Sequence, residues 1–453
     1  MSLSISLSKN GGKTMSEKQV DSLGLIKENY QDFSKYVIEQ RVYPSVLDGC
    51  KPVHRRCLWA SYKDCPRNLT KLPNHTGAVT RIHPHGECTS TIVRMGSKYA
   101  TPFPVYDTRG NWGDEENPAS AARYLECNLS QIAVDLYMEF LDSADYGSPE
   151  FAYEPLALPA YLPFAFLQGA KGIGSGTPTV YIPPLSAKDM IKYYISYLET
   201  GAHSYKVIKP SLDNSILVNT NKELVEILKT GYGTITTKAE VVLDKNKITI
   251  TRVPYGVLFS YLFGKLQSEI DSGKITMSDL STTEKYWEIE KAPRTSVDMK
   301  ELRDRVEKFL TSKQKVAMFW SEDSKCVQYG FYEIVEKTLG YLKSCSQKHF
   351  ATLYEKQKLL IEVLEVISGL KTGDKIKELY TKTKAESCQY LQTEFKCSEE
   401  IASSVLTKSI SYLTADHDDE MKDAKAKAKR YEKLSKDSTE YLIEKYKELL
   451  KKV

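Results

Sequence analysis

The chain has 453 residues, with 63 Lys and Arg against 59 Asp and Glu and a formal net charge of +4. This length exceeds that of a usual single domain and predicts two to four folding units with substantial cores. The charge balance is that of an ordinary soluble protein, so only the placement of the cations can indicate binding to a polyanion.

The sequence gives no sign of export or of membrane insertion. It contains no apolar run of about 18 residues, and its N-terminus lacks the apolar core of a signal peptide. Its nine cysteines show neither paired CxxC spacing nor the density of a disulfide scaffold, which predicts free thiols in a reducing compartment. We therefore expect a cytosolic protein without membrane contact.

The first half of the chain begins with a polar stretch, residues 1–20, that predicts a flexible arm. Residues 21–184 mix short helical patterns with many Pro and Gly, which is typical of a loop-rich domain. Residues 185–312 contain strand-like pieces, AEVVLD and KITITRVPY, that alternate around an Asp-Lys-Asn turn. This second unit is predicted to be α+β.

The second half predicts two long helices. No proline follows Pro293, and apolar residues recur at three- and four-residue steps from Phe331 to Leu370. A second charged, helix-forming stretch runs from Asp416 to Lys452. The pair predicts an antiparallel arm, and the shorter patterns of residues 372–415 predict a small helical knob between its helices. The fold class is therefore α+β with several domains.

A basic cluster lies in RVYPSVLDGCKPVHRR, which carries Arg41, Lys51, His54, Arg55 and Arg56 around turns that lead into an apolar run. Cations at such a turn and helix start suit phosphate binding. The alternative for such a cluster taken alone is a solvated basic patch.

A second cluster, TRIHPHGE, holds His83 and His85 on a rigid turn, where their imidazoles can hydrogen-bond a phosphate oxygen. Zinc ligation is the alternative for two histidines at this spacing. We favour phosphate contact because neither a cysteine pair nor an HExxH helix accompanies them.

A third cluster, RGNWGDEENPASAARYLE, starts with a glycine-rich turn at Gly110 and Gly113 and ends with Arg123 directly before Tyr124. An arginine can hold a phosphate against the phenol oxygen. Because a phenol has an ordinary pKa of about 10, attack on phosphorus needs a proton acceptor or a field of cations. The chain has 30 tyrosines, so spacing alone does not single out Tyr124.

A fourth segment, LPFAFLQGAKGIGSGTPTVYIPP, is a glycine-rich loop with Ile173 at its centre. Its glycines, which include Gly172 and Gly174, permit close backbone approach to phosphates, and Ile173 suits a wedge between bases. An ordinary connection is the alternative. The segment lacks GxxxxGK[ST], so it is not a nucleotide-binding P-loop.

Taken in order, the four segments, with TIVRMG after HPHGE, closely resemble the signature series of the gyrase A and topoisomerase IV A family, which belongs to the type IIA DNA topoisomerases. Weaker similarity continues through TGYGTITTKAEVV and ITRVPYG, and through the two long helices. The resemblance covers about residue 21 to the C-terminus.

The resemblance implies specific roles for the clustered residues. Tyr124 would join to a DNA 5′-phosphate, with Arg123 beside it, and His83, His85 and Arg41 would support the cleavage site. Ile173 would intercalate and bend the DNA. The remaining implied DNA contacts are Lys51, His54, Arg55, Arg56, Arg94, Gly172 and Gly174.

The resemblance also implies a domain plan. Residues 21–184 would form a winged-helix cleavage domain, residues 185–312 a tower domain, and residues 313–371 the end of the tower and the first coiled-coil helix. Residues 372–415 would form the knob of a dimerising exit gate, and residues 416–453 the second coiled-coil helix.

By the same resemblance, the chain would be the breakage and rejoining subunit of an ATP-dependent enzyme that relaxes and decatenates double-stranded DNA. It would act as a homodimer with a B-type partner subunit, in a heterotetramer or a larger complex. No EGDSA-like segment, downstream DxD or ATPase signature occurs, so Mg²⁺ and ATP are expected on the partner and no metal site in this chain. A bacterial or phage-infected cytoplasm is the expected location.

Four departures from the family pattern qualify the resemblance. The stretch from His85 to Thr91 is two residues short, and that from Gly113 to Tyr124 is one residue short. Glu87 replaces the usual aspartate, and Cys88 lies near the usual serine, so quinolone sensitivity does not carry over. The chain ends after the second long helix, as in the medium subunit of tailed-phage topoisomerases, so active negative supercoiling is not expected.

Two other functions fit parts of the sequence. A DNA-bending scaffold that does not cut would use the same basic clusters and Ile173, but the intact Arg123-Tyr124 pair disfavours it. A tyrosine recombinase or phosphotyrosyl nuclease would need a spaced Arg-His-Arg pattern, which is not visible.

Overall fold

The computed structural model describes residues 22–83, 88–114, 116–147, 153–173, 178–212, 215–254, 256–282, 284–371, 375–379 and 381–453. The predicted N-terminal arm, His85 and Gly174 lie outside these residues. The chain divides into two compact units, and each is considered by itself. The first comprises Met1–Glu139, Asp145–Leu339 and Leu449–Val453, and the second comprises Phe140–Ala144 and Gly340–Glu448.

The first unit begins with a helical region and a small antiparallel sheet. The elements in chain order are α1 (Ser22–Val37), the π-helix η1 (Ile38–Val42), α2 (Pro52–Asp64), β1 (Thr70–Lys71), α3 (Leu72–Ile82), α4 (Thr89–Gly96), β2 (Tyr106–Arg109), the 3-10 turn η2 (Ala122–Tyr124) and β3 (Glu126–Leu129). Strand β3 lies between β1 and β2, and Cys127 pairs with both Thr70 and Thr108. Helix α2 starts at Pro52, where the missing N–H of proline costs no helical hydrogen bond.

A buried polar network joins these helices to the sheet. His75 of α3 is fully buried, and its Nε2 lies 3.1 Å from the Cys127 carbonyl oxygen. Its Nδ1 lies 2.9 Å from Ser61 Oγ, which lies 3.0 Å from the Tyr106 hydroxyl. Because a carbonyl only accepts, Nε2 carries the proton and Nδ1 accepts from Ser61. Burial lowers the pKa of His75 and keeps the ring neutral.

The rest of the first unit is built around two larger antiparallel sheets. The next elements are α5 (Gln131–Tyr137), β4 (Tyr146–Gly147), β5 (Glu154–Pro155), α6 (Phe164–Gln168), β6 (Ala170–Gly172), β7 (Val180–Ile182), α7 (Ala187–Thr200), β8 (Ile216–Leu217), α8 (Asn221–Thr230) and β9 (Tyr232–Lys238). Strands β6, β7, β14 (Thr311–Ala317), β9 and β8 form a five-stranded sheet in that order, and β4 pairs with β5. Strand β6 and its neighbour β7 carry the glycine-rich segment into this sheet.

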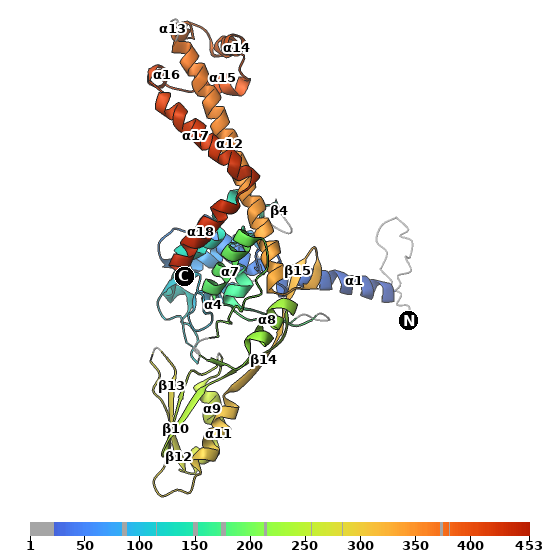
Figure 1. Ribbon diagram of the computed structural model, residues 1–453, viewed down its shortest axis with the longest axis vertical. Helices are drawn as coiled ribbons and strands as arrows, with labels where there is room; N and C mark the ends of the chain where they lie inside the picture. Colours follow the sequence, from blue (N-terminus) through green and yellow to red (C-terminus); the bar gives the residue numbers. More distant parts are fainter. Residues whose placement is uncertain are drawn as a thin grey trace, which may run out of the picture. The chain divides into compact units, whose positions relative to one another are not determined.

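A four-stranded sheet of order β10-β11-β13-β12 follows, with helices on one face (Figure 1). Its elements and the hairpin after it are β10 (Glu240–Asp244), β11 (Lys247–Thr251), α9 (Phe259–Lys265), α10 (Gln267–Asp271), β12 (Ile275–Asp279), β13 (Tyr286–Lys291), α11 (Met299–Phe309), β14 (Thr311–Ala317), β15 (Phe319–Glu322) and β16 (Lys325–Gln328). Ile248, Ile250 and Trp287 pack in one buried core with Leu262 and Val306. The predicted hairpin is confirmed, with Asp244 paired to Lys247.

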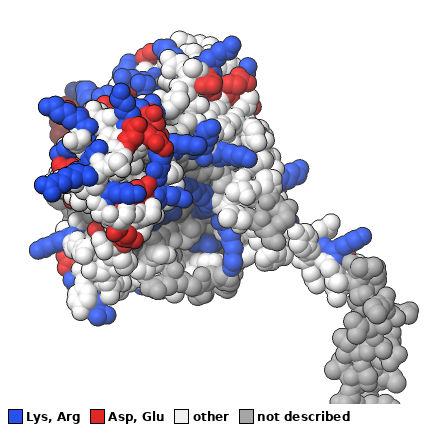
Figure 2. All heavy atoms as spheres, turned by 90° about the horizontal axis from the view of Figure 1, so that it is seen from below, with Lys and Arg blue, Asp and Glu red and all other residues white. Residues whose placement is uncertain are grey.

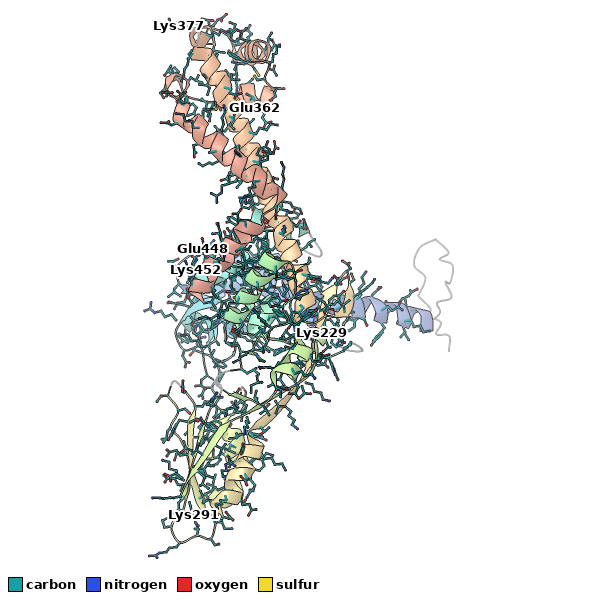
Figure 3. All side chains as sticks on the ribbon, viewed as in Figure 1. Lys229, Lys291, Glu362, Lys377, Glu448 and Lys452 are labelled. Carbon is teal, nitrogen blue, oxygen red and sulfur yellow. The ribbon has the colours of Figure 1, made fainter. Side chains whose placement is uncertain are left out.

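The long helix predicted from Phe331 to Leu370 is confirmed as α12 (Phe331–Lys371). In the second unit, the other elements are η3 (Leu141–Ser143), α13 (Lys375–Leu379), α14 (Lys384–Phe395), α15 (Glu399–Leu406), α16 (Ile410–Thr414) and α17 (Asp418–Lys436), with α18 (Thr439–Lys452) ending in the first unit. Helix α17 lies beside α12, since the rings of Phe350 and Tyr431 stack and Lys425 pairs with Glu365 (Figure 1). Lys452 lies at the end of α18 (Figure 3), and its ammonium donates to Asp135 of α5 at 2.7 Å.

The prediction of one unbroken helix from Asp416 to Lys452 is wrong, because the helix stops after Lys436 and α18 begins at Thr439. The Asp437 carboxylate accepts from the Thr439 N–H at 3.0 Å and pairs with Lys343 of α12 at 2.8 Å. Buried Ser438 lies 2.6 Å from Ser346 through their hydroxyl oxygens. Short polar side chains that bond nearby backbone favour helix ends over helix interiors, which explains the break.

Two general features complete the description of the fold. All nine cysteines are free thiols, as predicted. No helix among the described residues combines the length and the apolarity that crossing a membrane requires.

Acid is expected to loosen the helices around His75. The folded-state pKa of His75 lies below the ordinary value of about 6.5, so the unfolded chain takes up the proton first as the pH falls. Stability from this group is complete above pH 6.5 and is lost as the pH falls toward the folded-state pKa. Hydrogen exchange of the α3 amides, corrected for intrinsic rates, should show less protection at pH 5.5 than at pH 7.5. The His75→Gln variant should show a smaller change, and equal changes in both proteins would contradict the assignment.

Candidate functional site

Asp48 organises the turn that precedes α2. Its fully buried carboxylate accepts two hydrogen bonds from Arg55, from Nε at 2.7 Å and from Nη2 at 3.1 Å. It also accepts from the backbone N–H groups of Cys50 at 2.8 Å and Leu158 at 2.9 Å. The Arg55 guanidinium is therefore used inside the protein, where it holds the turn against the start of α2.

Arg56 is buried in the same way. Its Nε and Nη2 each donate to the Glu154 carboxylate at 2.8 Å, and Nη2 also lies 3.2 Å from Gln40. These ion pairs were not expected from the sequence, and a DNA contact by Arg55 or Arg56 stays a prediction. Both guanidinium groups are matched by carboxylates within the first unit.

Three other cations lie close together without such partners, and we call Lys51, Arg94 and Lys171 the cation cluster. Lys51 is the N-cap residue of α2, Arg94 lies in the last turn of α4 and Lys171 lies in β6. The Lys51 ammonium donates to the Lys171 carbonyl oxygen at 2.6 Å. Burial, and after it the Arg94 charge, lowers the pKa of Lys51 to about 8, and the same two causes lower the pKa of Lys171. No ion pair joins these three cations to a carboxylate in the described part of the chain.

His54 contributes an uncharged group beside the cluster. Its ring packs against Phe164 with a centroid distance of 4.9 Å, and its buried Nδ1 has no hydrogen-bond partner among the described residues. Burial and the charges of Lys51, Arg94 and Arg55 lower the pKa of His54 to about 3. Near neutral pH, any contact that His54 makes is that of a neutral imidazole.

A cavity of about 340 Å³ joins the cluster to the glycine-rich segment. It is lined by Phe33, Val37, Arg41, Val42, Lys51, Gly172 and Ile173. The structure thus brings together four residues that the sequence singled out. A Cβ on Gly172 would lie 2.8 Å from the Val42 carbonyl oxygen, so this position requires glycine. Ile173 is 85% exposed, which is unusual for an isoleucine and leaves its side chain open to a ligand.

Tyr124 is an exposed phenol on a fixed backbone. It ends η2, is 59% exposed, and has the Arg123 guanidinium 4.6 Å from its ring centroid. The next carbonyl, of Leu125, accepts from the Leu72 N–H at 2.9 Å. Gly110 lies under the turn with φ of 105°, and a Cβ there would lie 2.9 Å from the Tyr124 carbonyl oxygen. This close approach explains why glycine stands at residue 110.

The two parts of the site make no direct contact with each other among the described residues. Among the described residues, no hydrogen bond, ion pair or ring contact joins Tyr124 or Arg123 to the cation cluster. His83 ends α3, where its N–H bonds to the Val79 carbonyl at 3.0 Å, and His85 lies outside the described residues.

Sequence reasoning missed three residues of this site. Asp48 and Glu154 were missed because their partners become visible only in the fold. Lys171 was missed because a lysine in a glycine-rich loop carries no distinctive spacing, although it directly precedes Gly172 and Ile173. On the face shown in Figure 2, Lys and Arg side chains are widespread, so charge alone does not distinguish Lys171.

The sequence model that describes the A subunits of DNA gyrase and topoisomerase IV matches residues 41–451. The DNA gyrase A subunit of Buchnera aphidicola is 32% identical over 275 residues, which cover 55% of this chain and 32% of that protein. The chloroplastic/mitochondrial DNA gyrase A subunit of Arabidopsis thaliana is 25% identical over 453 residues, which cover 90% of this chain and 46% of that protein.

A third relative is a topoisomerase IV subunit by name. The DNA topoisomerase 4 A subunit of Borreliella burgdorferi is 28% identical over 266 residues, which cover 58% of this chain and 41% of that protein. The matched part therefore spans less than half the length of each of these three relatives.

Substitution of Gly110 should disturb the turn that carries Tyr124. In Gly110→Ala, the new Cβ meets the Tyr124 carbonyl and the backbone is strained at positive φ, so we expect a loss of about 1 kcal/mol or more in the free energy of unfolding. Gly77→Ala in α3 is the matched control, because nothing lies within 4 Å of its Cβ, and it should be neutral or stabilising. Equal stabilities of the two variants in urea titrations would contradict this account of Gly110.

Lys51 should titrate far below an ordinary lysine. Nuclear magnetic resonance of labelled lysine side chains should place its midpoint near pH 8. Arg94→Gln should raise the pKa of Lys51 without restoring its ordinary value, because burial is the larger cause. Arg430→Gln in α17 is the control and should leave the midpoint unchanged. A midpoint near 10.4, the ordinary lysine value, would remove the basis for the cation cluster.

Proposed function

The chain belongs to the family formed by the A subunits of DNA gyrase and topoisomerase IV, and we propose that it is the DNA breakage and rejoining subunit of a type IIA DNA topoisomerase. Its relatives are gyrase and topoisomerase 4 A subunits by name. The observation that carries the proposal is the exposed Tyr124 phenol beside Arg123 on a backbone fixed by Gly110 and Leu125. An exposed nucleophile beside a cation is what attack on a phosphodiester requires.

In the proposed reaction, the Tyr124 phenol oxygen attacks a DNA phosphorus and forms a phosphotyrosyl bond to the 5′-phosphate. The bond from phosphorus to the 3′-oxygen breaks, the phenol proton leaves to solvent or a base, and the 3′-oxygen is protonated. Religation is the reverse attack by the 3′-hydroxyl and needs no ATP, because the phosphotyrosyl bond retains the energy of the phosphodiester. Arg123 would stabilise the negative charge that develops on the phosphate oxygens.

Mg²⁺ and ATP are expected on a B-type partner subunit. A bound metal ion would stabilise the charge on the leaving 3′-oxygen. The residues of this chain would bind, orient and attack the DNA, while the partner would couple ATP to the passage of a second duplex.

The order of elements supports the predicted domains. The order α2-β1-α3-α4-β2-β3 with sheet order β1-β3-β2 is consistent with a winged helix, and Tyr124 lies two residues before the central strand β3. The four-stranded sheet with α9 to α11 fits a tower domain. In the second unit, α12 and α17 with the small helices α13 to α16 fit an exit gate that would join two copies.

A second copy also fits the layout of the site. Tyr124 makes no direct contact with the cation cluster of its own chain among the described residues, and DNA spanning a dimer would meet one tyrosine for each strand. A DNA-bending scaffold would use the cation cluster and Ile173 but would have no use for the Arg123-Tyr124 pair. The exposure of that pair favours cleavage over scaffolding.

Removing the phenol oxygen should abolish cleavage. With partner subunit, Mg²⁺ and plasmid, Tyr124→Phe should trap no covalent complex after detergent quench and should keep nearly full DNA affinity. Arg123→Ala should slow cleavage by about 10² to 10³, the usual cost of losing one transition-state donor. Tyr232→Phe is the matched control, because Tyr232 is 61% exposed against 59% for Tyr124. Cleavage by Tyr124→Phe at the wild-type rate would refute the mechanism.

Shortening Ile173 should reduce bending and cleavage together. Unstacking a base step costs a few kcal/mol, and alanine lacks the apolar bulk that offsets it. Energy transfer between dyes at the two ends of a duplex should show a smaller bent fraction with Ile173→Ala than with wild type. Ile410→Ala, which removes another exposed isoleucine from the second unit, should bend DNA normally. Unchanged bending by Ile173→Ala would remove Ile173 from the site.

A further inference from the structure

We propose that the Lys171 side chain binds a DNA phosphate next to the Ile173 intercalation step, while Lys51 acts by holding the backbone of β6 in place. The inference rests on the proposed function, since it names a further contact of the same DNA site. It assigns separate roles to two lysines that the geometry couples, and Lys171 matches none of the residues implied by the family pattern.

Lys51 has a partner inside the protein. Its ammonium donates to the Lys171 carbonyl at 2.6 Å, two residues before Ile173. Strand β6 pairs with β7 through Ala170 to Ile182 and Gly172 to Val180, so this carbonyl belongs to the paired strand that leads into Ile173. The hydrogen bond from Lys51 therefore connects the start of α2 to β6. Because Ile173 follows β6 directly, this bond helps to set the position of Ile173.

Lys171 is differently placed. The residue is exposed at the surface although its ammonium is partly desolvated, and the ammonium lies over the Tyr181 ring of β7 at 5.2 Å from the centroid. A cation over a ring keeps its charge and its N–H groups available to an anion. Within the described residues, no carboxylate forms an ion pair with Lys171.

The repulsion among the three cations of the cluster favours the binding of an anion. Lys51, Arg94 and Lys171 come from three different elements, and the Arg94 charge opposes the protonation of both lysines. Like charges held together without a counter-charge bind an anion more strongly than isolated lysines do, because the anion relieves their repulsion. Arg41 adds a further cation at the same cavity.

The shape of the site indicates which anion. Gly172 lets β6 pack closely against Val42, because a Cβ there would lie 2.8 Å from the Val42 carbonyl oxygen, and this packing fixes the backbone between Lys171 and Ile173. Ile173, at 85% exposure, presents an apolar wedge that a stack of bases can cover. Duplex DNA offers a phosphodiester to the cations and stacked bases to Ile173, whereas a free phosphate offers only the negative charge.

Salt dependence of DNA binding separates the two roles. Fluorescence anisotropy with the purified chain and a linear duplex, without partner or Mg²⁺, gives log affinity against log salt between about 50 and 200 mM. Lys171→Ala should lower the slope by about one and the affinity by about three- to tenfold, because one phosphate contact is lost. Lys171→Arg should restore both quantities. Lys188→Ala, an exposed lysine of α7, is the control and should match wild type.

Lys51→Ala should instead reduce the bent fraction seen by energy transfer and leave the salt slope near the wild-type value. If Lys171→Ala keeps the wild-type slope, Lys171 is not a phosphate ligand and the proposal is overturned. If only Lys51→Ala lowers the slope, Lys51 is the phosphate ligand, and this result also overturns the proposal. The proposed function fails on a different result, the absence of a Tyr124 adduct in the wild-type protein, and the binding assay does not depend on that chemistry.

Discussion

The buried carboxylate of Asp48 is the point from which the basic part of the site is built. Four hydrogen bonds converge on it, two from Arg55 and two from backbone N–H groups. A buried carboxylate is stable only when it is matched in this way, and removal of one partner typically costs about 3 to 5 kcal/mol. Since the turn and the first residues of α2 are fixed by this arrangement, Lys51 and His54 have defined positions. The buried Asp48 carboxylate thus fixes the backbone that positions Lys51 at the candidate site.

The candidate site uses charge in two opposite ways. Arg55 and Arg56 are neutralised by Asp48 and Glu154 and serve the fold. Lys51, Arg94 and Lys171 remain unmatched within the described residues, which leaves a local excess of positive charge for a ligand to offset. Tyr124 and Arg123 stand on a separate support, the turn before β3. In our account, DNA joins the two parts, and a second copy supplies the matching tyrosine for the other strand.

Much of the fold follows from local sequence rules, and the departures have physical causes. The periodicity from Phe331 and the absence of proline predict α12, and the alternating pattern around Asp244 and Lys247 predicts the hairpin. The break at Asp437 and Ser438 was missed because aspartate and serine are also common on the exposed faces of helices. The contacts of these two residues with α12, which explain the break, are visible only in the fold. The ion pair of Arg56 was missed because Glu154 lies 98 residues away. Tyr124 was identified through family motifs, since physical chemistry alone does not distinguish one of 30 tyrosines.

The central claim is that Tyr124 becomes linked to a DNA 5′-phosphate, and the most direct test is to identify the peptide left on DNA. The wild-type chain would be combined with a partner subunit carrying the ATPase and metal motifs, Mg²⁺ and plasmid, then quenched with detergent, digested and analysed by mass spectrometry. The account predicts a peptide containing Tyr124 on the 5′ end of the broken strand. A peptide with another tyrosine, a linkage to the 3′ end, or tight binding without any adduct would contradict it.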